Sequence, residues 1–351
     1  SYTRAYLRSV PGRDRIRKRI EELLSVETYD SLRKVGNRYF FRKREPHQEQ
    51  PCICMREGPN GEDHVLVDPA NRSEGSYIAA KLVQVSRDGK LLAYEVKRGG
   101  ERSGSIEILD VDRREKLPDE LPRGFLRGFA FAPDGKSFYY VHQPLDAGRR
   151  RLCTAYCHVL GSDLGNDRQV FFAGDDPRLR LGLCFERRRL GFFVATPGDA
   201  KACKFYLQEF GESTKPRLVF QAEGALFAPI LVESRILALT DNAAPNRRIV
   251  EVIPDRPNPA DWPDLIPESD ARLTGFALTA GHVFVSYLRD LRTQIDMYDL
   301  AGHKTREISF PQDQTIRILA SHHRCDELLY ESESFASPPA IYRYLPGEDR
   351  H

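Results

Sequence analysis

The fold is decided by a pattern that is clearest in residues 85–112, VSRDGKLLAYEVKRGGERSGSIEILDVD. A polar turn, Ser86 to Lys90, precedes the apolar cluster KLLAYEV (90–96), and a second apolar stretch, SIEILDVD (105–112), follows. The Asp-Gly pair in the turn tolerates the positive φ that a tight hairpin needs. The stretch therefore predicts short strands joined by tight turns.

The same pattern of a polar turn followed by an apolar cluster recurs along the chain. An apolar cluster after a polar turn appears seven times, as NRYFFRK, KLLAYEV, KSFYYVH, RLGFFVA, SRILALT, GHVFVSY and DELLYES. Their anchors are separated by 44 to 54 residues, and they are Tyr39, Leu92, Phe138, Phe192, Ile236, Val283 and Leu328. Strands of this kind at short intervals, rich in aromatic and β-branched residues, indicate an all-β fold.

A repeat of about 45 residues with about four strands in each unit is typical of a β-propeller. Seven units predict an all-β, seven-bladed β-propeller over residues 36–351. A β-solenoid has a much shorter repeat, and a β-sandwich would not show seven equal units. The chain has one tryptophan, Trp262, so the repeat is not of the WD40 type.

Residues 1–35 do not follow the repeat, and they predict a separate N-terminal helical segment. In RDRIRKRIEELLSV (13–26), the apolar residues Ile16, Ile20, Leu23 and Leu24 lie on one face of a helix. Such an amphipathic helix needs a partner for its apolar stripe. That partner is expected to be a domain outside this chain.

Composition and charge exclude several classes. The chain has 351 residues, of which 40% are hydrophobic, and 53 basic residues against 51 acidic ones leave a formal charge of +2. This balance argues against a nucleic-acid partner. No apolar run approaches the ~18 residues of a membrane helix, and the N-terminus lacks the apolar region of a signal peptide.

The seven cysteines predict free thiols rather than a disulfide framework, and therefore a reducing, cytoplasmic location. Cys52 and Cys54 could begin a metal site, but no further ligand pair follows at the required spacing. The alternation in PCICMRE favours a strand instead. Asp110 with Asp112, and Asp175 with Asp176, are interpreted as turn residues rather than cation ligands. No metal and no cofactor are expected.

A catalytic apparatus is not apparent in the sequence. The nucleophile elbow G-x-S-x-G is missing, since Ser137 and Ser213 have a glycine on one side only. Cys157 and His158 are neighbours in TAYCHVL, where alternation would point them to opposite faces of a strand. No phosphate-binding glycine loop is present. The basic clusters 149–151 and 187–189 are interpreted mainly as solvated turn residues.

Ordered segments along the whole chain resemble the prolyl oligopeptidase family, serine peptidases that cleave short peptides after proline. The resemblance is carried by YLRSVPGRDRIRKRIEELL (6–24), VGNRYFFRKREPHQEQ (35–50), LVDPANRSEG (66–75), the stretch 85–144, CHVLGSDLGNDRQVF (157–171), TDNAAPNRRIVEV (240–252) and YESESFASPPAIYRYLPGE (330–348).

The resemblance implies that the whole protein has two domains with different roles. In that family an N-terminal segment and the C-terminal part form an α/β-hydrolase domain, and a seven-bladed propeller between them limits the size of the peptides admitted. Residues 1–35 would then belong to the hydrolase domain. The catalytic Ser, Asp and His would lie beyond residue 351, and this chain alone would be inactive. The implied partners are short proline-containing peptides and the C-terminal α/β-hydrolase domain.

The resemblance also implies positions that line the substrate pocket. The family's pocket aromatic falls at Leu126, beside Phe125, and its methionine falls at Arg180. Its arginine and cysteine fall near Pro197 and Ala200. None of these positions keeps the family's residue type, so peptides would be bound differently here.

Two other functions remain open on the sequence. A stand-alone propeller could bind proteins or peptides without catalysis. A propeller enzyme with an active site in its own channel, such as a glycosidase, would need clustered carboxylates in the channel, and the expected inner strands show none in register.

Overall fold

The computed structural model describes residues 2–72, 77–122, 124–145, 152–196, 199–209, 215–222, 224–256, 258–311, 313–319 and 323–351. The side chains at positions 72, 127 and 199–202 lie outside this description. Two α-helices come first, α1 (Tyr2–Ser9) and α2 (Arg13–Leu24). Short 3₁₀ helices lie in later loops, as η1 (Pro69–Arg72), η2 (Leu164–Asn166) and η3 (Pro259–Asp261).

The strands form seven antiparallel sheets, each built from consecutive strands. The first strand of each sheet is β1 (Thr28–Val35), β5 (Ile78–Val85), β9 (Gly124–Phe131), β13 (Arg180–Glu186), β17 (Phe227–Val232), β21 (Arg272–Thr279) or β25 (Thr315–Ile318). The second is β2 (Arg38–Arg44), β6 (Leu91–Arg98), β10 (Ser137–Pro144), β14 (Arg189–Thr196), β18 (Arg235–Thr240), β22 (His282–Arg289) or β26 (Leu328–Glu333).

The outer strands complete the sheets. The third strand is β3 (Cys52–Glu57), β7 (Ser105–Asp110), β11 (Thr154–Val159), β15 (Asp199–Glu209), β19 (Arg248–Glu251), β23 (Arg292–Asp299) or β27 (Ala340–Tyr344). The fourth is β4 (Asp63–Val67), β8 (Glu115–Lys116), β12 (Arg168–Phe172), β16 (Arg217–Ala222), β20 (Asp264–Ile266) or β24 (Lys304–Ile308). Among the described residues, the seventh sheet has three strands.

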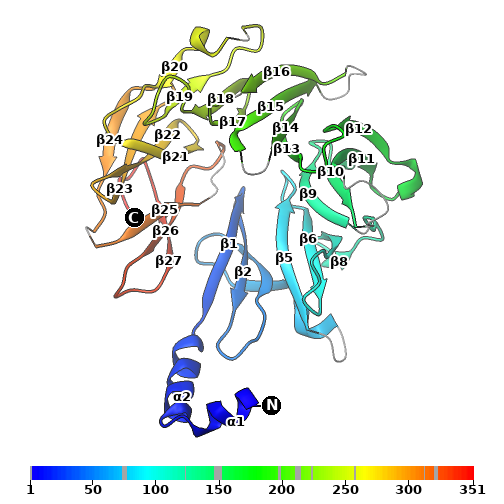
Figure 1. Ribbon diagram of the computed structural model, residues 1–351, viewed down its shortest axis with the longest axis vertical. Coiled ribbons are helices and arrows are strands. Elements are labelled where there is room, and N and C mark those ends of the chain that lie inside the picture. Colours follow the sequence, from blue (N-terminus) through cyan, green and yellow to red (C-terminus); the bar gives the residue numbers. More distant parts are fainter. Residues whose placement is uncertain are drawn as a thin grey trace.

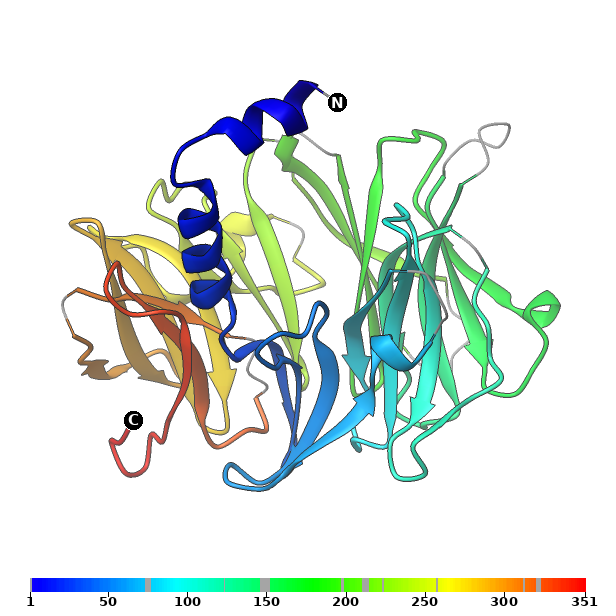
Figure 2. The same cartoon turned by 90° about the horizontal axis from the view of Figure 1, so that it is seen from below.

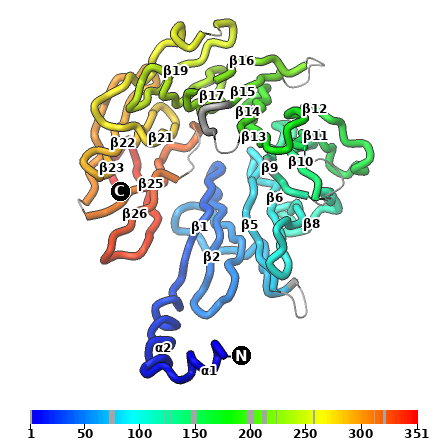
Figure 3. The backbone as a smooth tube through the Cα atoms, viewed as in Figure 1, coloured from blue at the N-terminus to red at the C-terminus, as the bar shows by residue number. Residues whose placement is uncertain are grey.

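The sheets stand around a central axis in chain order, as the blades of a seven-bladed propeller (Figures 1 and 3). The predicted fold is therefore confirmed. Each of the seven apolar clusters found in the sequence forms the second strand of a blade, and every anchor is buried. The anchors are buried because a second strand has a strand on each side and a neighbouring blade against each face.

The Asp-Gly turns form as expected at the ends of β5 and β9. Gly89 has φ +72° and Gly135 has φ +65°. The Asp88 carboxylate accepts hydrogen bonds from the Ser86 hydroxyl (2.7 Å) and the Lys90 amide (3.1 Å). An aspartate that accepts bonds from its own turn fixes the hairpin locally.

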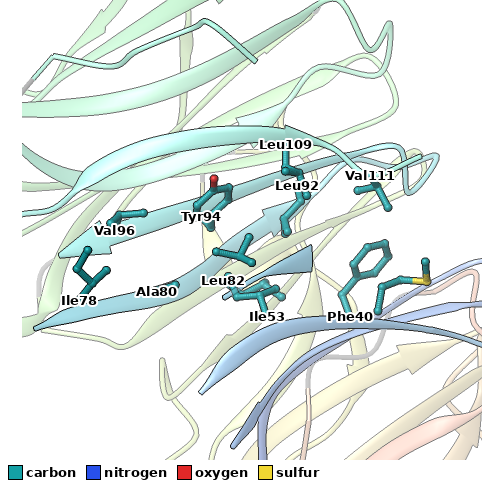
Figure 4. Packing of buried hydrophobic residues seen from close by; sticks show 12 residues of the cluster. Phe40, Ile53, Ile78, Ala80, Leu82, Leu92, Tyr94, Val96, Leu109 and Val111 are labelled. Carbon is teal, nitrogen blue, oxygen red and sulfur yellow. The ribbon is translucent and has the colours of Figure 1, made fainter. Parts of the chain in front are cut away.

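The core is divided among the seams between blades. A cluster of buried side chains occupies every seam, including the one between the seventh and first sheets. In the seam between the first two sheets, Phe40 and Ile53 belong to the same buried cluster as Leu92 and Tyr94 (Figure 4). Each such side chain contributes about 1.5–3 kcal/mol by leaving water. The blades are thus held to one another by side chains rather than by shared strands.

The seam that closes the ring is smaller and more polar than the others. Its cluster has five buried residues, Tyr39, Phe41, Cys52, Cys54 and Leu329, whereas the other six have seven to twelve. The Tyr39 hydroxyl donates a hydrogen bond to buried Glu327 (2.5 Å). No described strand is shared between the first and seventh sheets. Side-chain contacts therefore close the ring.

The expected division at residue 36 must be moved. It falls between β1 and β2, which are hydrogen-bonded neighbours with Val35 opposite Arg38, so the first blade begins at Thr28. The alternation in TYDSLRKV is broken by a bulge between Asp30 and Arg33, which hid this strand. The two helices precede the blade and lie outside the ring (Figures 1 and 2).

Candidate functional site: the central channel

The first strands surround the axis and carry the candidate site (Figure 1). We call the end where they begin, at residues such as Thr28 and Gly124, the helix face, because α2 leads into β1 there. We call the opposite end the turn face, because the turns from the first to the second strands lie on it. Residues from several of these turns line one common cavity, as described below.

The positions predicted from the sequence lie at the helix face of two neighbouring blades. Phe125 and Leu126 lie near the start of strand β9, and Arg180 is the first residue of β13. Pro197 lies outside the described residues. Ala200 lies in β15, and its side chain is not described. Their role in substrate binding stays a prediction.

Arg180 is held by its own loop. Its guanidinium Nη1 donates to the carbonyl oxygens of Pro177 (3.3 Å), Arg178 (3.0 Å) and Leu179 (3.1 Å). Leu126 packs against the buried cluster between the second and third blades. Neither residue lines the two channel cavities described next. Both side chains therefore have a structural task in this chain.

A cavity of about 700 Å³ occupies the channel on the side of blades four to seven. Its wall is largely apolar, with Ile230, Phe276 and Ile316 from three different first strands, and polar groups come from Arg317 and Glu186. A mostly apolar cavity with few charged groups is the usual form of a ligand site. This cavity could hold an extended peptide segment.

A second cavity, of about 420 Å³, lies at the turn face. It is lined by the ends of the first strands of blades one to four and by the β25–β26 connection, including Val35, Val85, Phe131, Phe185 and Cys325. Phe185 and Glu186 line both cavities. The two cavities therefore meet at Glu186.

Charged side chains cross the channel at this point. The Glu186 carboxylate, 5% exposed, lies 2.7 Å from the Arg87 guanidinium, 3.5 Å from His323 Nε2 and 3.8 Å from the Arg324 guanidinium. We call these four residues the Glu186 cluster. They come from blades two, four and seven, none of which are neighbours. Contacts between non-neighbouring blades have to span the lumen, so the cluster narrows the channel at the turn face.

A second ion network lies beside the cluster, between the first and seventh blades. The Lys34 ammonium contacts Asp326 (3.0 Å) and Glu327 (3.2 Å). Burial alone would lower the pKa of Lys34, but the bonds to these two carboxylates raise it above its usual value. Burial and the bond to Glu327 raise the pKa of Tyr39 to about 12. These contacts join the first and seventh blades and so hold the ring closed.

Other candidates from the sequence have structural roles. Cys157 packs toward the fourth blade, whereas His158 lies against Phe138 on the opposite face of β11. The two therefore do not form a nucleophile–base pair. The ring nitrogens of His158 lie within hydrogen-bond distance of two buried carboxylates, with Nδ1 2.7 Å from Asp167 and Nε2 2.9 Å from Asp119.

The acidic and basic candidates are also accounted for by local contacts. Asp110 and Asp176 accept backbone N–H bonds in their own turns. Arg187 pairs with Glu233, and Arg189 pairs with Glu209. Residues 149–151 lie outside the described residues. Cys52 and Cys54 are buried in the closing seam.

Within the described part of the chain, no group of three His, Cys, Asp or Glu side chains is arranged to hold a metal ion. All seven cysteines are free. Neither helix has the length and apolar character required to cross a membrane, and this holds for every helix among the described residues.

The helices present a second candidate surface. In α2, Ile16, Ile20, Leu23 and Leu24 are each about half exposed, at 49–61%. Tyr2 and Tyr6 of α1 are exposed as well, at 86% and 61%. No residue of either helix is buried. We call these six side chains the helix surface. An exposed apolar surface of this kind marks an interaction site.

Sequence reasoning missed the Glu186 cluster. Nothing local in the sequence connects Glu186 with Arg87, which lies 99 residues away. The signal that could have found the cluster is the position of its residues within the repeat. Arg87, Glu186 and His323 all fall in or beside the connection from a first to a second strand, which a propeller gathers at one mouth.

Known proteins share the sequence pattern and the fold of this chain. The sequence model of the family described as "Prolyl oligopeptidase, N-terminal beta-propeller domain" matches residues 1–350. A prolyl endopeptidase from Elizabethkingia miricola is 25% identical over 350 residues, which are 98% of this chain and 49% of the relative. One from Dictyostelium discoideum is 18% identical, over 97% of this chain and 54% of the relative.

Solved structures of a prolyl endopeptidase and a prolyl oligopeptidase have the same fold over almost the whole of this chain. A chain from a structural and mechanistic analysis of two prolyl endopeptidases superimposes with a TM-score of 0.89 and 26% identity, over 98% of this chain and 52% of that one. Prolyl oligopeptidase B from Galerina marginata, bound to a 25mer macrocyclization substrate, has a TM-score of 0.83 at 20% identity, over 99% and 53% of the two chains. The chain thus spans about half the length of these relatives.

Proposed function

Because this chain belongs to the prolyl oligopeptidase family, as its N-terminal β-propeller domain, we propose that it gates substrate in a serine endopeptidase that cleaves short peptides after proline. The observation that carries the proposal is the family match along residues 1–350. The relatives named above are prolyl endopeptidases about twice as long as this chain. The catalytic Ser, Asp and His are expected in the half that this chain does not span.

The helix surface supports a partner domain. Six large side chains of the two helices are exposed, and an apolar surface of this kind is expected to be covered by a partner. We propose that the cover is the C-terminal α/β-hydrolase domain of the same protein. The helices adjoin the start of β1, so the hydrolase would stand over the helix face of the channel.

The Glu186 cluster supports a gating role. Folded proteins and long chains cannot pass a lumen crossed by ion pairs, and the mouth at the turn face is where these pairs lie. Peptides would then approach the catalytic half from the helix face. The mostly apolar 700 Å³ cavity would accommodate part of a short peptide.

The free cysteines support a reducing compartment. Burial raises the pKa of Cys54 and of Cys184 to about 12, so these thiols resist ionisation and oxidation. We propose that the protein works in the cytoplasm, on proline-containing peptides, without a metal or cofactor.

The proposal is tested with the parent protein and with this chain. The parent should hydrolyse a Gly-Pro fluorogenic substrate, and a serine-directed phosphonate should stop the reaction. The 351-residue chain alone should show no turnover. Phosphonate-sensitive turnover by the chain alone, or none by the parent, would refute the proposal.

One observation favours a second candidate, a propeller that binds peptides without catalysis. The pocket positions inferred from the family carry Leu126 and Arg180, and the Arg180 side chain is occupied by carbonyl oxygens of its own loop. Peptide binding by a parent protein that lacks hydrolysis would favour this candidate.

A further inference from the structure

A third cavity, of about 580 Å³, lies in the seam between the seventh and first blades. Residues 30–33 of β1 form one wall, and Arg317 to Leu319 form another. Arg317 and Ile318 also line the 700 Å³ channel cavity. The seam cavity therefore adjoins the lumen, within reach of a ligand that occupies the channel.

The backbone of β1 is distorted where it passes this cavity. Asp30 pairs with Arg42 and Arg33 pairs with Phe40, so the register shifts between Asp30 and Arg33. Ser31 has φ +58°, a conformation that residues other than glycine, asparagine and aspartate rarely adopt. A bulge of this kind redirects the side chains that follow it, and strained backbone is often retained at binding sites.

Two ion pairs in the cavity are already complete. Arg42 Nε and Nη2 donate to the two oxygens of Asp30, at 2.6 and 2.8 Å. Arg317 Nε and Nη2 donate to Glu331, at 3.1 and 2.8 Å. These four charges neutralise one another.

Arg33 is the third arginine that lines this cavity, beside Arg42 and Arg317. Among the described residues, its guanidinium donates one hydrogen bond, from Nη1 to the carbonyl oxygen of its chain neighbour Leu32 (2.9 Å), and no described carboxylate pairs with it. Water reaches the side chain through the cavity, yet the protein around it lowers the pKa of the guanidinium by desolvation. For Arg38 and Arg56 in the same blade, paired carboxylates raise the pKa instead.

We propose that Arg33 anchors a carboxylate-binding site in the channel wall. A guanidinium has five N–H donors in a planar fork that matches a carboxylate, and Arg33 uses one of them internally. The inference rests on the proposed function for the identity of the ligand, a peptide. The carboxylate could be the C-terminus of that peptide or an acidic side chain, and both have the same chemistry.

The test measures the affinity of the 351-residue chain by titration calorimetry for three peptides. They are Ala-Gly-Pro-Ala as the free acid, the same peptide as its C-terminal amide, and the amide of Ala-Gly-Pro-Glu. Charge-assisted hydrogen bonds contribute enough for a carboxylate to improve affinity roughly tenfold or more. A free acid that binds tighter than its amide identifies the C-terminus. A tighter Glu-containing amide identifies the acidic side chain.

Variants assign the effect to Arg33. Arg33→Gln should abolish the preference for a carboxylate, and Arg33→Lys should retain only part of it, because lysine lacks the fork. Arg113→Gln is the matched control, since it removes one positive charge from the exposed β7–β8 turn. It should retain the full preference. Unchanged thermal unfolding of Arg33→Gln establishes that the variant is folded.

The outcomes separate this inference from the proposed function. Equal affinity for acids and amides, or a preference that survives in Arg33→Gln, refutes the carboxylate site and leaves the proposed function standing. A carboxylate preference that persists when proline is replaced by alanine supports the site and counts against proline-specific peptides. Absence of binding by every peptide refutes the site.

Discussion

The Glu186 carboxylate of the fourth blade lies 2.7 Å from the Arg87 guanidinium of the second blade, although the third blade separates them in the ring. A contact within one seam would stabilise only two neighbours. This contact spans the lumen instead, and His323 and Arg324 extend it to the seventh blade. The same group of charges therefore braces the ring and obstructs its turn face.

The bracing role predicts a loss of stability in Glu186→Gln. Glu186 is 5% exposed, and its removal would leave partly buried cations without a counter-charge. We expect the free energy of unfolding to fall by about 3 kcal/mol, as for other buried pairs that lose one partner. Urea denaturation measures the change. The matched control is Arg187→Gln, whose pair with Glu233 is about half exposed and should contribute less than about 1 kcal/mol. Equal effects of the two substitutions would contradict a bracing role.

The obstructing role predicts a change in size selection. In the parent protein, Glu186→Ala should open the turn face as a second route to the lumen. We expect kcat/KM to rise severalfold for long internally quenched peptides and to stay unchanged for a dipeptide-length substrate. The control is Glu233→Ala, which removes an exposed carboxylate from the same face. If the ratio of the two kcat/KM values does not move, the cluster does not limit access.

His158 lies in a buried polar network beside the third blade. Its two ring nitrogens face Asp119 and Asp167, and the three side chains are 1–4% exposed. His158→Gln leaves at least one of these two buried carboxylates without its imidazole partner, and we expect the free energy of unfolding, measured by urea denaturation, to fall by about 3 kcal/mol. His303→Gln, at a histidine 80% exposed, should change stability by less than about 0.5 kcal/mol. A small effect at His158 would show that these contacts do not stabilise the blade.

The second strands of the blades were predictable because their signals are local. Each combines a turn with an apolar run, as in Ser86 to Val96, and each becomes buried on both faces. β1 was missed for the converse reason. The bulge at Ser31 interrupts the alternation of apolar and polar residues in β1. The charged residues Asp30 and Arg33 also make the segment unlike a buried strand in sequence, although β1 pairs with β2 in the first blade.

The candidate site was less accessible to sequence reasoning. The pairing of Arg87 with Glu186 depends on where two blades stand around the axis, and their sequence separation carries no pattern. The resemblance implied Arg180 as a pocket position, and this stays a prediction; the bonds from its guanidinium to carbonyl oxygens of its own loop could not be foreseen from the sequence. Local sequence decides which strands form, whereas ring geometry decides which side chains meet in the channel.

The helix surface predicts self-association of the isolated chain. Ile20 and Leu23 are 49% and 57% exposed on the stripe of α2. Without a covering domain, two copies can bury these stripes against each other. We expect light scattering to show concentration-dependent association that Ile20→Glu with Leu23→Glu abolishes. Val65→Glu, at a single exposed side chain of β4, is the control and should have no effect. A monodisperse monomer at high concentration would contradict the prediction.

Asp63 predicts part of the acid sensitivity of the first blade. Burial alone would raise its pKa, but hydrogen bonds from Arg56 (2.6 Å) and Lys43 (3.1 Å) lower it below its usual value. A carboxyl whose pKa is lower in the folded state stabilises the fold above the unfolded pKa of about 3.9. That stabilisation is lost as the pH falls through the folded pKa.

Asp63→Asn isolates this contribution. At pH 7 the variant should be less stable by about 2 kcal/mol, the contribution expected of hydrogen bonds to a charged group. The difference from the unmodified chain should hold down to about pH 5 and shrink below about pH 4, because protonated Asp63 no longer attracts the two cations. Urea midpoints across this range measure it. Asp14→Asn, at a side chain 96% exposed on α2, should leave the midpoints unchanged at every pH. A difference for Asp63→Asn that is independent of pH would show that the carboxylate acts by packing rather than by charge.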